Sequence, residues 1–506
     1  MSDSIFILLI IVVGMPIFGA VVTLALRDKC AGRAGVFFSV LTAIAGISAI
    51  VRNFPNASNR LFGSMPWLQS ATDHAVHLKL FGVAIDPLSS IMLIVTTVIG
   101  ALIAIYSTEY LSRRNVEHPT SEGQGRYYFW LLLFIGSMTG LAVSPNLLQL
   151  FIFWELTTLC SWALISFTET EKALKAGFKA LIMTHLGAIF FLIGLLILFI
   201  STKSFDFSAL ASPALSDATR SFVFIMFLVA AWAKAAQIPF HTWLPEAMEA
   251  PTPISAYLHA AAMVKAGVYL IARIVGATWA ASTGATGEHG IMISNGVGIV
   301  VGVMAILTML MAMMFYFLQD DLKRLLAYST IAHLGYVLLG LSLGILGSAV
   351  AYQGGVLHII CHGFAKTTLF LAVGAVSYAA GTRSISKLGG VAKQLPIAAA
   401  AFFVGAFAAT GLPPFACFWS KFWILTGAMA THTPIGVIFL VLALGESLVS
   451  FAWFLRIGQR VFFGTAPEGL VVQNPSPAIN WVLIALIVMC IAAPFIGLPL
   501  VEAIKF

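Results

Sequence analysis

An all-α, polytopic membrane protein with about fourteen transmembrane helices is the fold class that the sequence predicts. Of the 506 residues, 60% are hydrophobic and 9% are charged, whereas an ordinary soluble domain has roughly 25% charged residues. Apolar runs close to the ~20 residues that a helix needs to cross a bilayer recur from one end of the chain to the other. Two longer runs carry prolines at their centres, which predicts broken helices.

The predicted spans lie at approximately 4–26, 34–52, 84–107, 127–144, 147–167, 178–201, 220–245, 252–276, 293–317, 325–345, 350–379, 396–428, 433–456 and 478–501. The first run follows the acidic Asp3 and has basic residues such as Arg33 on its far side, so we expect a retained first helix and no signal peptide. The longest connections, 53–83 and 108–126, leave no room for a separate soluble domain. Residues 1–506 are therefore expected to form a single membrane domain.

Two spans contain central breakers. The span 220–245 contains Gln237-Ile238-Pro239, and the span 396–428 contains Gly411-Leu412-Pro413-Pro414. Proline removes a helical hydrogen bond and clashes with the preceding turn, so each segment should be a broken helix. Interrupted helices in corresponding positions, here the seventh and twelfth, indicate an internal repeat with transport sites at its interface. Because the twelfth helix follows the seventh by an odd offset of five, the repeats should be inverted in the membrane.

The distribution of charge predicts an orientation and excludes nucleic acid as a partner. The basic residues gather in alternate loops, such as the one with Arg113 and Arg114 and the one with Arg383 and Lys387. The positive-inside rule then predicts that both termini lie outside the cytoplasm.

Redox cofactors are not expected in this chain. The five cysteines are scattered without a CxxC pair, which argues against disulfides and iron–sulfur ligation. A P-loop, a dinucleotide fingerprint and a nucleophile motif in a credible setting are also absent from the sequence.

Lysines inside apolar spans are the strongest functional signal. Lys234, Lys265 and Lys366 lie in the middle of such runs, and Lys421 lies in the second broken span. Burying an ammonium in hydrocarbon costs roughly several kcal/mol, so such residues usually mark pathways for charge. Lys179 is close to the start of its span, where its side chain can reach the interface, so snorkelling explains it equally well.

Two carboxylates also lie in apolar spans. Glu155 must be protonated or paired with a cation; it is either half of a structural ion pair or half of a functional pair with a lysine such as Lys234, and we favour the functional pair. Burial disfavours the charged form of both partners, which brings proton exchange within reach. Glu446 is a second candidate, and the sequence does not identify its partner.

Three residues at i, i+4 and i+8 form a stripe on one helical face about 12 Å long: His358, His362 and Lys366. Imidazole titrates near physiological pH and can accept a proton on one nitrogen while it donates from the other, so the stripe suits a proton relay. Zinc is the alternative, but there is no HExxH and only Cys361 stands nearby as a further ligand. His259 and His333 are additional relay candidates, or packing residues if each stands alone.

Long motifs identify a resemblance to the antiporter-like subunits of respiratory complex I. They are 246–256 with 258–260, 265–269, 321–330, the helix of His358, His362 and Lys366, and Gly411 to Pro414 with Ser420-Lys421. A narrower likeness, to the D component of hydrogenase-4 in the energy-converting nickel–iron hydrogenases, is carried by 110–112, 117–119, 160–166, 446–447 and 450–454.

The resemblance implies N-terminal helices 1–3 at 1–107, a first repeat (helices 4–8) at 127–276, a second repeat (helices 9–13) at 293–456 and a C-terminal helix at 478–501. It implies a Glu155–Lys234 pair, a central relay of Lys265 with the histidine stripe, and Lys421 on the exit side. Phe422 stands where the family often has an aspartate, which leaves open how Lys421 is held. The chain also stops after the fourteenth span, so we expect another subunit to clamp the assembly.

The expected function is proton translocation by a non-catalytic subunit of a multi-subunit membrane oxidoreductase, of the formate hydrogenlyase or hydrogenase-4 type, in a bacterial or archaeal inner membrane. Its expected partners are other membrane subunits, including further antiporter-like ones, a peripheral hydrogenase arm and the lipid bilayer. A nickel–iron centre and iron–sulfur clusters are expected in those partners. The alternatives are an Mrp-type cation/proton antiporter subunit, a complex I (NADH-quinone oxidoreductase) membrane subunit and a structural spacer.

Overall fold

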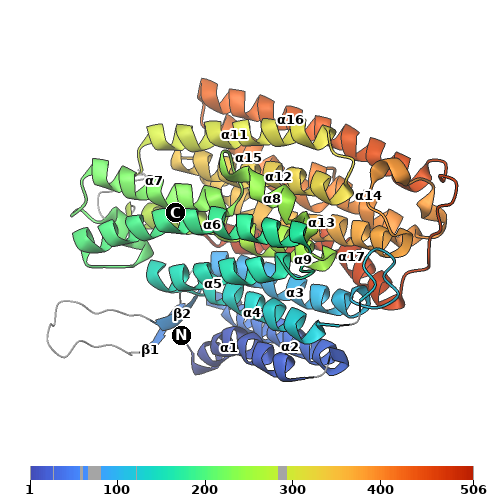
Figure 1. Ribbon diagram of the computed structural model, residues 1–506. Helices are drawn as coiled ribbons and strands as arrows, with labels where there is room; N and C mark the ends of the chain where they lie inside the picture. Colours follow the sequence, from blue (N-terminus) through green and yellow to red (C-terminus); the bar gives the residue numbers. More distant parts are fainter. Residues whose placement is uncertain are drawn as a thin grey trace.

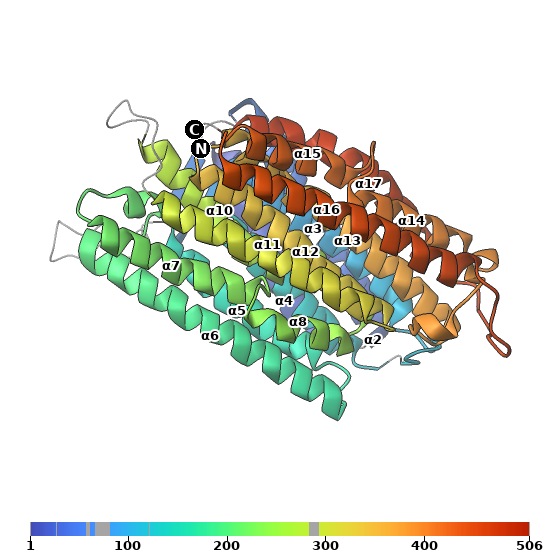
Figure 2. The same cartoon turned by 90° about the horizontal axis from the view of Figure 1, so that it is seen from above.

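The computed structural model describes residues 2–26, 28–56, 61–65, 81–120, 122–282 and 293–504. Its strands and α-helices are α1 (Asp3–Ala25), α2 (Asp28–Asn53), β1 (Leu61–Met65), β2 (Phe81–Ile85), α3 (Pro87–Tyr110), α4 (Gln124–Ala142), α5 (Leu147–Ile165), α6 (Glu171–Thr202), α7 (Asp217–Lys234), α8 (Trp243–Glu246), α9 (Thr252–Ala256), α10 (Met263–Ser282), α11 (Asn295–Phe317), α12 (Leu322–Ile345), α13 (Ala349–Ala380), α14 (Pro396–Thr410), α15 (Ala416–Met429), α16 (Pro434–Gly458) and α17 (Pro477–Glu502). The helices run side by side, with α1 and α2 at one edge and α16 at the other (Figure 1). Both ends of the chain lie at the same end of the bundle (Figures 1 and 2).

The all-helical membrane class is confirmed. Among the described residues, 11 helices are long and apolar enough to cross a membrane. Three of the predicted spans do not correspond to one of these 11 helices. They are 127–144, which is α4, and the two broken segments 220–245 and 396–428, whose halves are individually short or less apolar. The number fourteen and the inverted repeats therefore stay predictions.

Both predicted breaks are present. The helix α7 ends at Lys234, and the chain passes through Gln237 and Pro239 before helical turns resume. The second break lies between α14 and α15, where Gly411 adopts a φ of +91° that favours glycine. A third interruption is not predicted by the sequence pattern: a π-helical turn, η5 (Tyr257–Ala261), separates α9 from α10 four residues before Lys265. Such turns often occur at functional sites.

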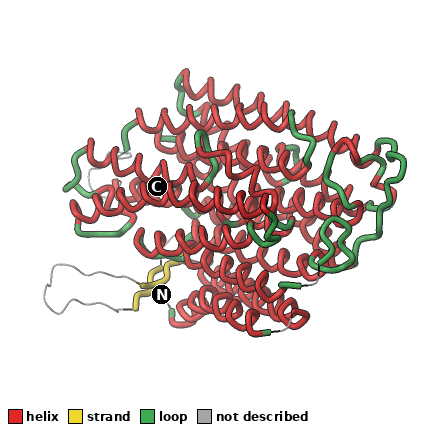
Figure 3. The backbone as a smooth tube through the Cα atoms, viewed as in Figure 1, coloured by secondary structure: helices red, strands yellow, loops and turns green. Residues whose placement is uncertain are grey.

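A two-stranded antiparallel hairpin is the one β-sheet in the described ranges (Figure 3). It pairs Leu61 with Ile85, at the two ends of a stretch for which the sequence predicts a plain connection. The Gln149 side chain, on α5, donates to the Gly82 carbonyl and accepts from the Gly82 amide, at 3.0 Å each. This tertiary contact satisfies the backbone amide and carbonyl of Gly82, and local sequence does not reveal it.

The central helix of the bundle is α13. The most apolar stretch of α13 is entirely buried within the protein, and the corresponding stretch of α12 is 94% buried. In α16, by contrast, only 28% of this stretch is buried. Close approach of α12 to α13 depends on two facing glycines, because a Cβ on Gly340 would stand 2.7 Å from the Gly355 Cα. The histidine-bearing faces of both helices are thereby brought together in the core.

Candidate functional site: a buried line of lysines and histidines

Lys234 is completely buried at the C-terminal end of α7, next to the first break. Its Nζ donates to the Trp154 carbonyl at 3.0 Å and to Thr158 Oγ1 at 2.6 Å, and it lies 5.1 Å from the centre of the Trp154 ring. These partners flank Glu155 on α5. The ammonium therefore rests on neutral oxygen atoms beside the carboxylate.

The Glu155 carboxylate contacts a residue that sequence reasoning missed. Its Oε2 lies 2.8 Å from Nδ1 of His185, on α6, and no contact within ion-pair distance joins it to Lys234 among the described residues. The direct Glu155–Lys234 pair is therefore not formed in this structure, because Lys234 is occupied by Trp154 and Thr158. The position of His185 in an apolar span is the signal that the sequence offers for it.

The histidine stripe on α13 meets Lys265 and His333 in the centre of the bundle. The Lys265 Nζ donates to the Ile359 carbonyl at 2.6 Å and contacts His362 Nδ1 at 2.9 Å. His333 Nδ1, from α12, shares a hydrogen bond of 3.3 Å with His358 Nε2. All four side chains are buried, so one ammonium and three imidazoles form a single cluster.

Lys366 extends this cluster by one turn of α13. Its ammonium donates to the hydroxyl of Ser329, which lies four residues before His333 on α12. The other ring nitrogen of His358, Nδ1, lies 2.8 Å from Ser420 Oγ, on α15. The cluster thus joins four helices, α10, α12, α13 and α15, through short polar contacts.

Lys421 is held by oxygen atoms of neutral groups. Its Nζ donates to Ser447 Oγ at 2.7 Å and to the Thr410 carbonyl at 3.4 Å, and it lies 4.2 Å from the centre of the Tyr336 ring. Tyr336 in turn donates to Glu446, which supplies the partner that the sequence left unidentified.

Two further candidates lie apart from these contacts. His259 is completely buried in η5, stacks on Phe370 and has no hydrogen-bond partner on either ring nitrogen within the described parts of the chain. Lys179 forms an ion pair with Glu246, and both side chains are substantially exposed. Lys179 thus belongs to the surface.

Gln237, in the first break, is a further residue that sequence reasoning missed. Its amide donates to the Ala235 carbonyl at 2.9 Å and to the Ile331 carbonyl at 3.4 Å, two residues from His333. Its Oε1 is buried without a partner among the residues that the structure describes. A buried amide beside the break proline thus lies between the Lys234 region and the central cluster.

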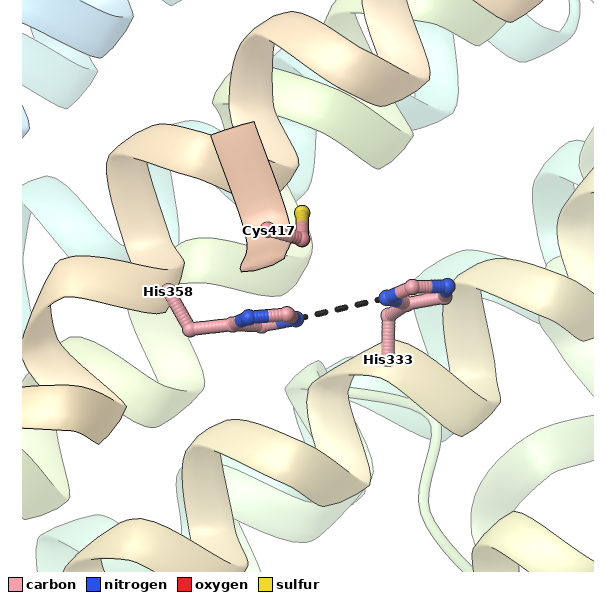
Figure 4. A group of neighbouring side chains, drawn as sticks. All are labelled: His333, His358 and Cys417. Carbon is pink, nitrogen blue, oxygen red and sulfur yellow. Dashed lines mark hydrogen bonds between the residues drawn. The ribbon is translucent and has the colours of Figure 1, made fainter. Parts of the chain in front are cut away.

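One group of side chains has the composition of a metal site. One ligand atom each of His333, His358 and Cys417 lies within 4.8 Å of the others, with the thiol above the gap between the two rings (Figure 4). The sequence pattern indicates His358 with His362, whereas Cys417 is too far along the chain for spacing to reveal it. Two imidazoles and a thiolate suit zinc, but a zinc site needs a fourth ligand. The positive charges of Lys366 and Lys421 also act on His333. This positive surrounding favours proton transfer over a resident cation.

The loops 111–120, 318–321 and 381–395 meet at the end of the bundle opposite the termini, which we term the basic-loop end. Arg383 Nε donates to Asp321 at 2.6 Å, and its other nitrogens lie 3.7 Å from Glu117 and 3.9 Å from Glu249. Burial acts to lower the pKa of Arg383, but these carboxylates raise it by more, so the pKa lies above its ordinary value. A cavity of about 490 Å³ opens here, lined in part by Glu117, Asp321 and Arg383.

Comparison with known proteins assigns the family. Residues 144–445 match the model described as "NADH:quinone oxidoreductase/Mrp antiporter, TM", and residues 67–128 match "NADH-Ubiquinone oxidoreductase (complex I), chain 5 N-terminus". The chain belongs to the NADH:quinone oxidoreductase/Mrp antiporter transmembrane family. The candidate residues from Glu155 to Lys421 lie inside the longer match, and Glu446 lies one residue beyond its end.

Relatives in this family come from two settings. The chain is 36% identical to chloroplastic NAD(P)H-quinone oxidoreductase subunit 5 of Physcomitrium patens, over 78% of this chain and 52% of the relative. It is 35% identical to Na(+)/H(+) antiporter subunit A1 of Staphylococcus aureus, over 77% of this chain and 49% of the relative. The chain thus spans about half the length of these curated relatives. A chain in the structure of the Mrp complex from Dietzia sp. DQ12-45-1b matches with a TM-score of 0.81 and 28% identity, over 98% of this chain and 51% of that one.

Proposed function

We propose that this chain is the proton-translocating, antiporter-like subunit of a multi-subunit membrane oxidoreductase of the formate hydrogenlyase or hydrogenase-4 type. One observation carries the proposal: an ammonium, that of Lys265, contacts a cluster of three imidazoles in the interior of a membrane bundle. Buried titratable groups of this kind mark ion pathways. The narrower assignment to hydrogenase rests on the sequence motifs at 110–112, 117–119, 160–166, 446–447 and 450–454.

The relay works through the charge of neighbouring groups. Lys265 passes a proton to His362, and the His333–His358 hydrogen bond carries it across to the Ser420 and Lys421 side. Among the described residues, His362 and His333 each have a buried Nε2 without a partner, and their rings lie 5.2 Å apart, so ring rotation or a bridging water would join them. Low polarity around the groups makes the charge on one strongly affect its neighbour.

Redox chemistry in partner subunits would drive these steps. A nickel–iron centre and iron–sulfur clusters in a peripheral arm would supply it, and other antiporter-like subunits would extend the line within the membrane. The Glu155–His185 pair, partly exposed on the outer face of α5 and α6, supports a covering partner on that side, because a charged group is costly against lipid.

A second candidate function is cation/proton antiport, which the similarity to Na(+)/H(+) antiporter subunit A1 of Staphylococcus aureus favours. The two functions differ in their dependence on sodium. Proton translocation by the proposed subunit should proceed in sodium-free vesicles, whereas an antiporter should require sodium or another transported cation. A third candidate, a membrane subunit of an NADH-quinone oxidoreductase, predicts that an NADH-oxidising module copurifies in mild detergent where we expect a nickel–iron module.

The decisive variant is Lys234→Met, tested in the intact complex. Methionine keeps the length of the side chain and removes the charge. We expect proton translocation into vesicles to be lost, while electron transfer in detergent is largely retained. A Lys234→Met complex that translocates protons at the wild-type rate would contradict the proposal.

A further inference from the structure

The second buried carboxylate, Glu446, occupies an unusual environment. It lies on α16, with 2% of its surface exposed, and no ion pair within the described parts of the chain includes it. Its carboxylate instead accepts hydrogen bonds from two hydroxyl groups, Tyr336 at 2.8 Å and Ser450 at 2.5 Å. A buried carboxylate without a cation is costly unless it binds a proton or receives several hydrogen bonds.

An unbroken line of hydrogen bonds connects Glu446 to Lys421. The Lys421 ammonium donates to Ser447 Oγ at 2.7 Å, and Ser447 Oγ lies 2.7 Å from the Tyr336 hydroxyl. An ammonium can only donate, and a carboxylate can only accept. Because Tyr336 donates its single proton to Glu446, Ser447 must donate to Tyr336, so every hydroxyl in the line points toward the carboxylate. The Ala443 carbonyl is a competing acceptor for Tyr336.

The line continues from Glu446 toward the basic-loop end. Ser450 Oγ lies 2.6 Å from the hydroxyl of Tyr316, on α11. Tyr316 is the last residue but one of α11, and Leu318, two residues on, is 77% exposed. The hydroxyl groups of Ser450 and Tyr316 therefore extend the line from the buried carboxylate to the last turn of α11, where Tyr316 is itself buried.

We propose that Glu446 is a proton-loading carboxylate, which exchanges protons with Lys421 through Ser447 and Tyr336 and with the basic-loop end through Ser450 and Tyr316. The proposal rests on the proposed function, because it assigns one end of the proton line.

In the loading step the Lys421 ammonium gives a proton to Ser447, which passes its own proton to Tyr336, and Tyr336 passes its proton to Glu446. The products are a neutral amine and a neutral carboxylic acid, so two separated buried charges disappear together. The carboxylate is restored when Glu446 gives its proton to Ser450, Ser450 passes its own proton to Tyr316, and Tyr316 passes its proton to water at the basic-loop end.

Charged and titratable groups on four other helices surround Glu446. Lys421 comes from α15, Lys366 from α13, Tyr336 from α12 and Tyr316 from α11, and Lys366 and Lys421 both act electrostatically on it. Protonation of Glu446 removes its electrostatic attraction to the ammonium groups of Lys366 and Lys421. The carboxylate is thus placed to couple its own proton to the charge of the central cluster.

The test uses the intact complex, reconstituted into vesicles, with Glu446→Gln, Tyr336→Phe and the double variant. Phenylalanine keeps the ring beneath Lys421 and removes only the hydroxyl. Tyr106→Phe is the matched control, because Tyr106 is equally buried and its hydroxyl bonds to the Leu371 carbonyl outside the line. Incorporation of each subunit into the complex is measured alongside proton translocation.

We expect each single variant to lower the translocation rate by about tenfold or more, because a positioned proton-transfer group contributes roughly 10²–10⁴ in rate. The double variant should be no slower than the worse single variant, because both interrupt one line. Independent packing roles would instead multiply the two losses. Tyr106→Phe should match the wild type.

Wild-type rates in Glu446→Gln or Tyr336→Phe, or multiplied losses in the double variant, would overturn the inference. The failure of the proposed function is distinguishable, because then the wild-type complex itself would translocate no protons. In a third outcome the wild type translocates protons, Lys234→Met is impaired, and the Glu446 and Tyr336 variants behave normally. That result would support the proposed function and refute only the role of the line through Glu446.

Discussion

Replacement of Lys265 gives the sharpest test of the relay. Its ammonium donates to the Ile359 carbonyl and to His362, at 2.6 Å and 2.9 Å, and is completely buried. Lys265→Met removes both hydrogen bonds, worth roughly 1.5–3 kcal/mol each when the donor is charged. It also removes the cost of burying an ammonium, which is roughly several kcal/mol. Because the two effects oppose each other, we expect the subunit to stay folded and assembled.

The effect on transport should be much larger. A positioned proton-transfer group contributes roughly 10²–10⁴ in rate, so Lys265→Met should lower proton translocation by about 100-fold or more. Lys265→Arg should be equally inactive, because arginine keeps the charge and the donors but does not release its proton. The assay follows acidification of vesicles that contain the complex, with electron transfer measured in parallel.

The arginine variant separates two explanations. If Lys265 served only as a fixed positive charge, Lys265→Arg would translocate protons at the wild-type rate, and the relay reasoning would be refuted. Lys179→Met is the matched control, because the Lys179–Glu246 pair is substantially exposed and such pairs contribute only about 0–1 kcal/mol. Its translocation rate should stay within about twofold of the wild type.

Three further predictions concern other parts of the structure. Glu155→Gln keeps a hydrogen-bonding group beside His185 and removes the titratable carboxylate. Proton translocation should therefore fall by about tenfold in an assembled complex. An unchanged rate would assign the Glu155–His185 pair a purely structural role. Gly340→Ala places a Cβ 2.7 Å from the Gly355 Cα, so it should lower the free energy of unfolding of the subunit by about 1–3 kcal/mol. Gly14→Ala is the control, because a Cβ on Gly14 would have no atom within 4 Å. Equal melting temperatures of the two variants in thermal unfolding would contradict the prediction. Partial burial acts to raise the pKa of Asp320, and hydrogen bonds from Ser384 and Ser386 lower it by more, so its pKa is below the ordinary value. The hydrogen bond from the Ser386 amide to the Asp320 carboxylate is therefore present at neutral pH and is lost as the pH falls through that lowered pKa. Hydrogen exchange of the Ser386 amide, compared at each pH with the exchange of an unprotected amide, measures the loss. Protection that persists below that pKa would contradict the prediction.

Several elements follow from the sequence for local reasons. The apolar spans follow from composition, and the breaks near Pro239 and Pro413 follow from the missing amide of proline. The stripe of His358, His362 and Lys366 follows from helical periodicity, and the structure places all three on the buried α13. Loops predicted to share one side do meet, through the contacts of Arg383 with Glu117 and Asp321.

Other features required the tertiary structure. The hairpin depends on Gln149, which is far from Gly82 in the chain. The partner of Glu155 depends on how α5 packs against α6, which brings His185 to the carboxylate and leaves Lys234 on Trp154 and Thr158. Neither contact has a periodic signature, because each joins helices whose relative rotation is set by packing.

The sequence by itself determined that this is a helical membrane protein with costly charged groups at mid-span, since composition and hydrophobic length are local properties of the chain. Only the tertiary structure decided which of those groups touch. The line from Lys421 through Tyr336 to Glu446 joins α15, α12 and α16, and hydrogen bonds of 2.7–2.8 Å form only after the helices have packed in one rotation and register.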